Sequence, residues 1–431
     1  MPARLSLILA DRPTGRAALV ALAGAVEGSP VGARVDLALA RGVEAVASAA
    51  RQAAGGGQEV VVAWSFLSPE VAEVREELAR ARSGMPARVV NLAGGAHATA
   101  DPAGTLALGF DLVARGEGER TLVGVLEKLA AGGDPRGVAG LAWGSRAGLA
   151  TSGRPEPVRL DDHPGFSRRL VKALWLEVTR GCAWGCRFCQ TPFLHRRRFR
   201  HRSVASARAF ARFARSLGHR DLRLLTPSAL SYGAEGGEVR LEAVEELLAA
   251  LREELGGDGR LFLGSFPSEL RPEHVSPAAL RLLRRFVDNR ELLLGAQSGS
   301  ERLLAEMKRG HGTSEVVRAV RLASAAGFRV AVDFIVGLPG ETAEDLAATR
   351  RLMAELAQRG ARIHAHAFLP LPGTPLRDRA PGQVDPATRA LLDRLGSRGR
   401  AYGSWRRQLE LGEALSRLRG EGPRPGGSGG G

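Results

Sequence analysis

Cysteine is almost absent from this 431-residue sequence, which contains only Cys182, Cys186 and Cys189. Three thiols cannot form a disulfide framework, and their crowding into one short stretch favours metal ligation in a reducing compartment. No run of about 18 uncharged apolar residues occurs, and the start, MPARLSLILADRPTG, is typical of a buried strand that ends in a turn, not of a signal peptide. We therefore expect a cytoplasmic protein with no membrane-spanning helix.

Lysine is also scarce, because Lys128, Lys172 and Lys308 are the only lysines among 61 basic residues. The net charge of +15 suggests nucleic-acid binding, but the arginines are scattered along every segment and are better explained as solvated surface. The densest run is HRRRFRHR, residues 195–202, directly after the cysteines. Three interpretations of this run stay open: a solvated loop, an RNA contact, or positive charge that offsets a metal cluster.

Apolar runs alternate with helical patterns along most of the chain, which predicts an α/β protein with two main domains. In residues 1–144 this rhythm predicts a doubly wound, Rossmann-like parallel sheet. Residues 145–172 are rich in Pro, Gly and Asp and predict a linker. Six further βα units over residues 173–376 predict a partial (β/α)6 barrel of the TIM type, with its active site at the C-terminal ends of the strands. Residues 377–419 predict a helical segment and residues 420–431 a disordered tail.

The three cysteines follow the first expected barrel strand, in a loop where Gly181 and Gly185 let the backbone fold around a small object. Zinc would need a fourth protein ligand, which His195 or His201 could supply. A [4Fe–4S] cluster needs no fourth ligand and keeps one iron open for chemistry. Buried, inert cysteines are the remaining alternative.

The segment RGCAWGCRFC resembles the CxxxCxxC signature of the radical SAM superfamily, with the aromatic Phe188 directly before the last cysteine. The resemblance extends over most of residues 174–376. It implies that Cys182, Cys186 and Cys189 hold a [4Fe–4S] cluster. In that family the cluster cleaves S-adenosylmethionine (SAM) to a 5′-deoxyadenosyl radical, with electrons from a flavodoxin- or ferredoxin-like donor.

Other segments resemble the SAM-binding strand ends of the same family, and they imply the SAM contacts Phe188, Thr226, Ser228, Gln297, Ser298, Gly337, Leu338 and Gly340. The family's Gly-Gly-Glu segment is replaced by TPSALSYG, so backbone carbonyls near Thr226–Ala229 would take over its role. Structural roles stay open for two groups. The glycines after residue 336 could form a turn without contacting SAM. Ser298 and Ser300 could cap a helix without contacting SAM. His364 and His366 share one face of a strand and are core or substrate-pocket residues.

A doubly wound domain ahead of such a barrel resembles the B12-binding-domain/radical SAM proteins. That resemblance implies cobalamin contacts at Asp11, Gly94, Gly95, His97, Gly116, Glu117 and Gly118. Cobalamin proteins with an Asp-x-His-x-x-Gly turn ligate cobalt through its histidine, whereas the turn here is ADRPTGR. Either cobalamin binds in another mode, or the domain has kept the shape and lost the cofactor; His97 is expected to be a structural or tail-contacting residue.

The sequence thus predicts a radical SAM enzyme that is cobalamin-dependent and transfers a methyl group to an unreactive carbon or runs a related radical reaction. Its catalytic residues and substrate are not specified by any motif. A tRNA methylthiotransferase carries a second set of cluster cysteines in its N-terminal domain, and this chain has none before Cys182. A non-catalytic cobalamin- or metal-binding regulator is the alternative from another class, together with a different tRNA-modifying radical SAM enzyme.

Overall fold

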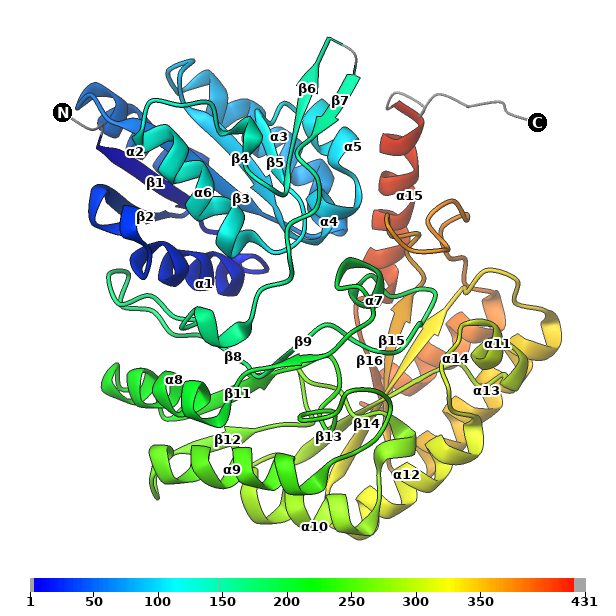
Figure 1. Ribbon diagram of the computed structural model, residues 1–431. Helices are drawn as coiled ribbons and strands as arrows, with labels where there is room; N and C mark the ends of the chain where they lie inside the picture. The colour runs from blue at the N-terminus through cyan, green and yellow to red at the C-terminus, as the bar shows by residue number, and fades with distance from the viewer. Residues whose placement is uncertain (1–3, 147, 422–431) are drawn as a thin grey trace. The chain divides into compact units, whose positions relative to one another are not determined.

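The computed structural model describes residues 4–146 and 148–421 and divides into two compact units (Figure 1). Unit 1 holds the described residues up to Leu19, Ser29–Glu156 and those from Leu411 on. Unit 2 holds Val20–Gly28 and Pro157–Glu410. Residues 422–431, most of the expected tail, lie outside the described part, and Gly420 and Glu421 belong to the last helix.

Unit 1 is a doubly wound sheet with strand order β2-β1-β3-β4-β5-β6-β7. The first five strands in this order are parallel, and β6 and β7 add an antiparallel edge. All six side chains of β1 are buried, as expected for a strand covered on both faces. The strands are β1 (Leu5–Ala10), β2 (Val35–Ala40), β3 (Glu59–Ser65), β4 (Val90–Gly94), β5 (Leu112–Ala114), β6 (Leu141–Ser145) and β7 (Gly148–Thr151). The helices are α1 (Arg16–Glu27), α2 (Val43–Gly55), α3 (Val71–Ser83), α4 (Gly95–Ala100), α5 (Pro102–Ala107) and α6 (Gly118–Ala130).

Unit 2 is an open barrel of parallel strands with helices on its outer side (Figure 1). Its two sheets have the orders β12-β11-β8 and β13-β14-β15-β16, and a parallel bridge between Leu270 and Leu294 connects them. The strands are β8 (Leu176–Glu177), β11 (Asp221–Leu225), β12 (Arg260–Phe262), β13 (Glu291–Gln297), β14 (Arg329–Val336), β15 (Arg362–Ala367) and β16 (Ala401–Tyr402). The helices are α8 (Val204–Ser216), α9 (Leu241–Leu255), α10 (Pro277–Phe286), α11 (Glu301–Glu306), α12 (Thr313–Ala325), α13 (Ala343–Gln358), α14 (Pro386–Ser397) and α15 (Trp405–Glu421).

The predicted fold class, an α/β chain with a doubly wound domain and a partial barrel, is confirmed. Each of the six expected barrel strands is present. The sequence did not predict β16, a two-residue strand that pairs with β15 and extends the sheet.

Side chains along β14 and β15 point alternately to the two faces of the sheet, and this determines which residues lie in the barrel interior. Ile363, Ala365 and Ala367 of β15 pack into the apolar core of unit 2. Because successive side chains point to opposite faces, His364 and His366 lie on the other face, toward the barrel interior. The same alternation in β14 sends Asp333 inward. The two histidines are therefore interior residues.

The loop that carries the cysteines is closed by a short antiparallel ladder, which we name the clasp. Its strands are β9 (Thr179–Arg180) and β10 (Arg200–His201), and α7 (Thr191–Leu194) lies between them. Gly181 has φ +82°, and a Cβ there would lie 2.0 Å from the carbonyl oxygen of Arg198. The loop therefore requires glycine at its first position.

None of the helices in the described part of the chain combines the length and the apolar character that crossing a membrane requires.

Candidate active site

A cavity of about 390 Å³ lies inside unit 2, at the C-terminal ends of the barrel strands. All three cysteines line it. The remaining wall combines aromatic and aliphatic side chains with a few buried charges. The residues that the argument uses are Trp184, Phe188, Thr226, Ser228, Phe266, Glu269, Arg271, Gln297, Arg309, Asp333, His366 and Phe368.

The cysteines are partly or fully buried, and Cys186 is the most buried of the three. Burial and the neighbouring Cys186 raise the pKa of the Cys189 thiol to about 11. Burial also raises the pKa of Cys182. Cys182 and Cys189 are therefore protonated at neutral pH, and a metal must displace those protons to bind.

The spacing of the thiols distinguishes zinc from a larger cluster. Among residues 4–146 and 148–421, Asp333, His364 and His366 form the one group of three or more His, Cys, Asp or Glu donor atoms that all lie within 4.8 Å of one another. At least one pair of cysteine sulfurs is therefore farther apart. Bonds of about 2.3 Å around a single tetrahedral zinc ion would hold sulfurs about 3.8 Å apart. The arrangement fits a multi-iron cluster, in which each thiolate binds its own iron.

His201 is not free to complete a zinc site. Its Nδ1 lies 2.9 Å from Thr179 Oγ1, and its Nε2 lies 2.7 Å from the carbonyl oxygen of Ala234. Both ring nitrogens thus have hydrogen-bond partners within the protein. This histidine supports the clasp and the loop after β11.

Two arginines outside the basic run supply positive charge next to the thiols. Arg309 donates from Nη1 to Cys186 Sγ at 3.5 Å and from Nη2 to the Gly295 carbonyl at 2.5 Å. Arg271 lies 3.7 Å above the ring of Trp184 and donates to Glu273. Both guanidinium groups are buried. The sequence analysis missed them because no motif marks either residue.

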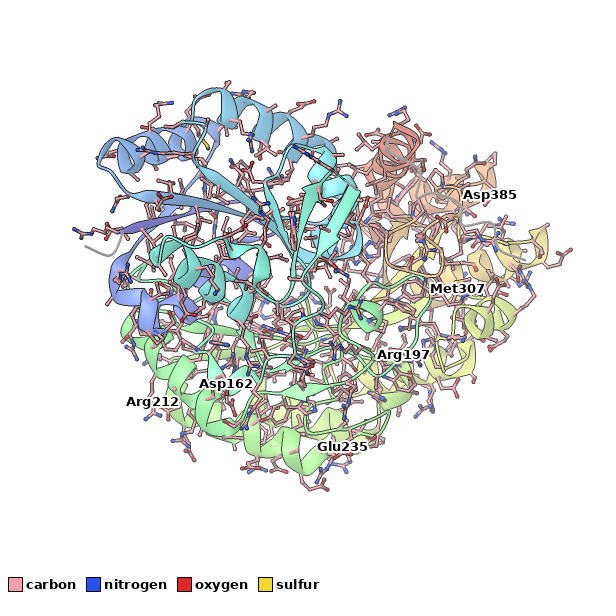
Figure 2. The ribbon with its side chains drawn as sticks, turned by 45° about the horizontal axis from the view of Figure 1, so that its top comes forward. Asp162, Arg197, Arg212, Glu235, Met307 and Asp385 are labelled. Carbon is pink, nitrogen blue, oxygen red and sulfur yellow. The ribbon has the colours of Figure 1, made fainter. Side chains whose placement is uncertain are left out.

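The basic run serves mainly the clasp and its surroundings. Arg202 is buried and donates to the carbonyl oxygens of Glu177 and His163. Arg200 donates to the Val158 carbonyl at 2.6 Å. Arg197 lies on the surface of the loop, and it is labelled in Figure 2 together with Met307, whose carbonyl accepts from the Arg187 backbone.

Four of the expected SAM contacts line the cavity: Phe188, Thr226, Ser228 and Gln297. Gln297 ends β13 at an irregularity in the pairing with β14 and has φ +75°, a conformation that non-glycine residues seldom adopt. Such a strained residue in a cavity wall is typical of a functional site. Thr226 Oγ1 donates to the Ser228 carbonyl at 3.0 Å, which fixes the turn after β11.

The other four expected SAM contacts are not among the residues that line this cavity. Ser298 Oγ accepts from the Ser300 backbone and lies 3.3 Å from Thr349 Oγ1 of α13. Gly337 has φ +74°, and a Cβ there would approach the Gln383 backbone to 2.6 Å. Leu338 packs against Met307, Phe368 and Leu376, and the Gly340 carbonyl accepts from Arg302. Their contact with SAM stays a prediction.

Two carboxyl groups, Glu269 and Asp333, lie with His366 on the cavity wall. The sequence analysis named only His366 of these three, as a core or substrate-pocket residue. Glu269 exposes much of its side chain to the cavity, whereas Asp333 is almost fully buried. The Glu269 carboxyl donates a hydrogen bond to Asp333. Burial and the proximity of Asp333 raise the pKa of Glu269 to about 7. Burial also raises the pKa of Asp333. Glu269 and Asp333 therefore share a proton near neutral pH.

The expected cobalamin contacts of unit 1 gather where the parallel strands end, the edge at which doubly wound sheets bind ligands. A Cβ on Gly94 would lie 3.8 Å from the Trp64 carbonyl oxygen, and a Cβ on Gly116 would lie 3.6 Å from Pro155, so both would be in ordinary van der Waals contact with the protein. Gly95 is different, because a Cβ there would lie 2.8 Å from the Phe66 carbonyl and its role is internal. Glu117 and Gly118 begin α6.

Neither Asp11 nor His97 is a free side chain at this edge. Asp11 forms ion pairs with Arg16 and Arg41. His97, the only histidine in residues 1–156, is buried, and its Nδ1 lies 3.1 Å from Ser68 Oγ. Next to Asp11, Arg12 is buried and bonded to Glu70, Glu73 and Glu77. The residues present therefore fit a nucleotide held through the backbone, without a protein imidazole as its lower ligand.

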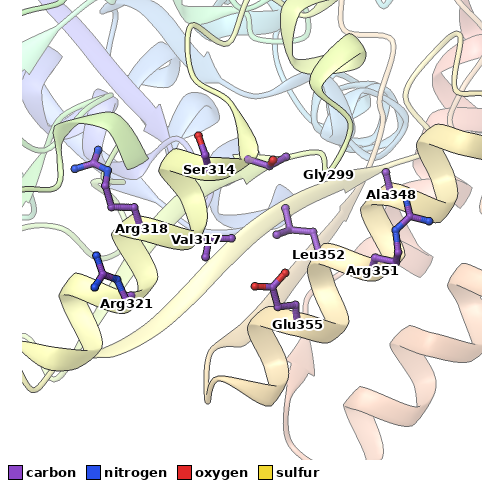
Figure 3. A pocket seen from close by; sticks show the side chains of 10 residues that line it. Gly299, Ser314, Val317, Arg318, Arg321, Ala348, Arg351, Leu352 and Glu355 are labelled. Carbon is purple, nitrogen blue, oxygen red and sulfur yellow. The ribbon is translucent and has the colours of Figure 1, made fainter.

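A second hollow lies outside the barrel, between α12 and α13, and is more open (Figure 3). Arg318, Arg321 and Arg351 surround its apolar floor of Val317 and Leu352. None of the cavity residues described above lines it.

Comparisons with known proteins agree with this site. Residues 176–353 match the Radical SAM superfamily. A tRNA-2-methylthio-N(6)-dimethylallyladenosine synthase of Saccharophagus degradans is 31% identical over 239 residues, which are 53% of this chain and 50% of that protein. The synthase of Shewanella denitrificans is 30% identical over 213 residues, 47% of this chain and 42% of that protein. The chain spans about half the length of these curated relatives.

Solved structures resemble most of the chain. The radical S-adenosylmethionine methyltransferase TsrM of Kitasatospora setae, solved with tryptophan and a SAM analogue, covers 86% of this chain and 75% of its own, with TM-score 0.65 and 18% identity. The cobalamin-dependent S-adenosylmethionine radical enzyme OxsB covers 81% of this chain and 52% of its own, with TM-score 0.63 and 15% identity. At these identities the likeness shows a shared fold. Residues 176–353 thus match the Radical SAM superfamily, and the chain has the fold that TsrM and OxsB share.

Proposed function

We propose that this protein is a cobalamin-dependent radical SAM enzyme that modifies an unreactive carbon of its substrate, by methyl transfer or a related radical step. The observation that carries the proposal is the placement of all three thiols on a closed loop in the wall of the barrel cavity. When bound, the [4Fe–4S] cluster supplies the electron and the open iron for SAM cleavage, and cobalamin supplies the methyl group or a second radical centre.

The protein's own residues prepare this chemistry in three ways. Cys182, Cys186 and Cys189 would hold three irons, and the clasp keeps the loop in one conformation. Arg309 offers positive charge to the thiolates from a buried position. The aromatic and aliphatic wall that includes the buried Phe368 gives the radical an apolar surface.

Cobalamin is proposed for unit 1 because Gly94 and Gly116 lie where the parallel strands β4 and β5 end, the edge at which such sheets bind nucleotides. The solved structures that share the fold include one of TsrM with cobalamin bound. Since His97 is engaged with Ser68, we propose that cobalamin binds without a protein imidazole below the cobalt.

The test is anaerobic purification with reconstituted iron and sulfide, followed by an assay for 5′-deoxyadenosine with and without cobalamin. We expect reductant-dependent cleavage of SAM, abolished in Cys186→Ala. We also expect His97→Ala to leave the visible spectrum of bound cobalamin unchanged. Stoichiometric zinc in place of iron, without deoxyadenosine, would refute the radical reaction; iron and cleavage without cobalamin binding would refute only the second cofactor.

The curated relatives favour a second candidate, modification of tRNA. Against it stands the sequence itself, because no cysteine remains outside the loop to hold a second cluster. The tRNA function would be supported if the reconstituted protein retained tRNA at physiological salt. Variants that remove the charges of Arg196 and Arg198 should then lose this binding.

A further inference from the structure

We propose that Asp333, His364 and His366 bind one divalent transition-metal ion of the zinc class inside the barrel, in addition to the cluster at the cysteines. This site goes beyond the proposed function, since SAM cleavage does not depend on it. Two imidazoles and a carboxylate are donors that suit zinc, ferrous iron or similar ions, whereas magnesium prefers oxygen ligands alone.

The backbone register brings these three side chains together. Asp333 of β14 lies directly opposite His364 of β15, and Ile335 lies opposite His366. Since residues two apart share a face, both imidazoles and the carboxylate project from one patch of the sheet. Their donor atoms all lie within 4.8 Å of one another. Side chains on paired strands hold a geometry better than side chains on loops.

The distances are close to those of a bound ion. His364 Nδ1 lies 2.7 Å from Asp333 Oδ1, and His366 Nε2 lies 4.0 Å from the same oxygen. Bonds of about 2.1 Å to a tetrahedral ion separate donor atoms by about 3.4 Å. Changes of about 0.7 Å and about 0.6 Å in these two distances would therefore reach the separation that an ion requires. The ring of Tyr402 stacks on His364 at 4.4 Å and keeps its orientation fixed.

The carboxyl groups of Asp333 and Glu269 would be stabilised by a cation. Asp333 is almost fully buried, and a buried carboxylate is costly without a positive partner. Arg309 acts on both carboxyl groups electrostatically, but its hydrogen bonds go to Gly295, Cys186 and His311. No hydrogen bond from an arginine or lysine to either carboxyl is present among residues 4–146 and 148–421. A divalent ion would supply the missing charge.

Gln408 of α15 sets how tightly the ion is held. Its Oε1 accepts from the Ala367 backbone N–H at 2.8 Å, so its amide nitrogen faces His366 Nδ1 at 3.3 Å. A metal on His366 Nε2 needs the proton on Nδ1, where it would meet this amide N–H. Glutamine thus weakens the site and makes the ion exchangeable. A glutamate at position 408 would accept hydrogen bonds from the Ala367 backbone N–H and from His366 Nδ1–H, and would support a histidine that binds the ion.

Asp333 and His366 line the cavity, so the open coordination positions of the ion face the space for substrate. The ligand class implied is a substrate with an oxygen or nitrogen donor, which the ion would position and polarise.

The test uses cluster-loaded enzyme, kept anaerobic, with zinc chloride as the probe. After equilibration and desalting, zinc and iron per chain are measured by elemental analysis, and zinc affinity by competition with a chelating dye. Samples are compared at equal iron content, so that zinc on vacant cysteines does not contribute. The variants are His366→Ala, Gln408→Glu and, as matched control, His219→Ala, which removes an exposed histidine far from these strands.

We expect about one zinc per chain in the wild type and the control, and none in His366→Ala. Gln408→Glu should bind zinc about 10-fold more tightly. Absence of zinc from the wild type, or equal zinc in His366→Ala, would overturn the site. Unchanged or weaker affinity in Gln408→Glu would overturn the role of His366. SAM cleavage in the same samples reports separately on the cluster.

Discussion

Arg309 should set the reduction potential of the cluster, because its guanidinium is the buried cation bonded to a cysteine ligand. Nη1 lies 3.5 Å from Cys186 Sγ. At an effective dielectric constant of about 20, opposite unit charges about 4 Å apart attract by about 4 kcal/mol. An electron spread over several irons feels roughly half of this, so Arg309→Met should lower the potential by on the order of 100 mV.

The matched control is Arg309→Lys, which keeps the charge and loses the bidentate geometry. We expect its potential to stay within about 30 mV of the wild type, a difference of about 0.7 kcal/mol for one electron. The assay is a redox titration monitored by the EPR signal of the reduced cluster, at equal iron content. Equal potentials in Arg309→Met and the wild type would refute the electrostatic role. A large shift in Arg309→Lys as well would assign the effect to the hydrogen bonds instead.

Two further predictions concern the loop and a buried acid. Gly181→Ala should lower the iron content after reconstitution, because its Cβ would collide with the Arg198 carbonyl and open the clasp. The control is Gly218→Ala, because Gly218 has the same φ of +82° with open space around it. This control should lose only about 1 kcal/mol of stability and should bind as much iron as the wild type. Equal iron loss in both would contradict this. Burial raises the pKa of Glu341 to about 7. The folded protein therefore holds that proton more tightly than the unfolded chain, and stability falls as the pH rises from about 4.5 to about 7. In urea unfolding, Glu341→Gln should be more stable than the wild type by about 3 kcal/mol at pH 8 and nearly equal to it near pH 4.5; a difference independent of pH would contradict the pKa.

The sequence predicts the fold because its strands are runs of apolar residues between helical patterns. Such runs identify β1, β3, β13 and β14 directly. β16 is only Ala401–Tyr402 and carries no pattern of its own, since its place depends on pairing with β15. The clasp was missed for a similar reason. An arginine-rich stretch predicts a loop, and its strand pairing depends on contact with residues 20 positions earlier.

The site was predictable where chemistry needs a local spacing, as for the three cysteines. Charge partners that come from separate strands and loops have no such signature. Arg309 and Glu269 reach the cavity from different elements, and only the folded barrel brings them to it. Alternation placed His364 and His366 on one face, but the packing of Ile363 and Ala365 against the helices decides that this face is the interior.

The most direct test of the whole account is the EPR spectrum of the reduced, reconstituted protein before and after addition of SAM. An iron left open by three cysteine ligands should bind SAM, so the signal should change shape and g values on addition, with 5′-deoxyadenosine formed under turnover. A spectrum indifferent to SAM would contradict the open coordination site on which the proposed chemistry depends.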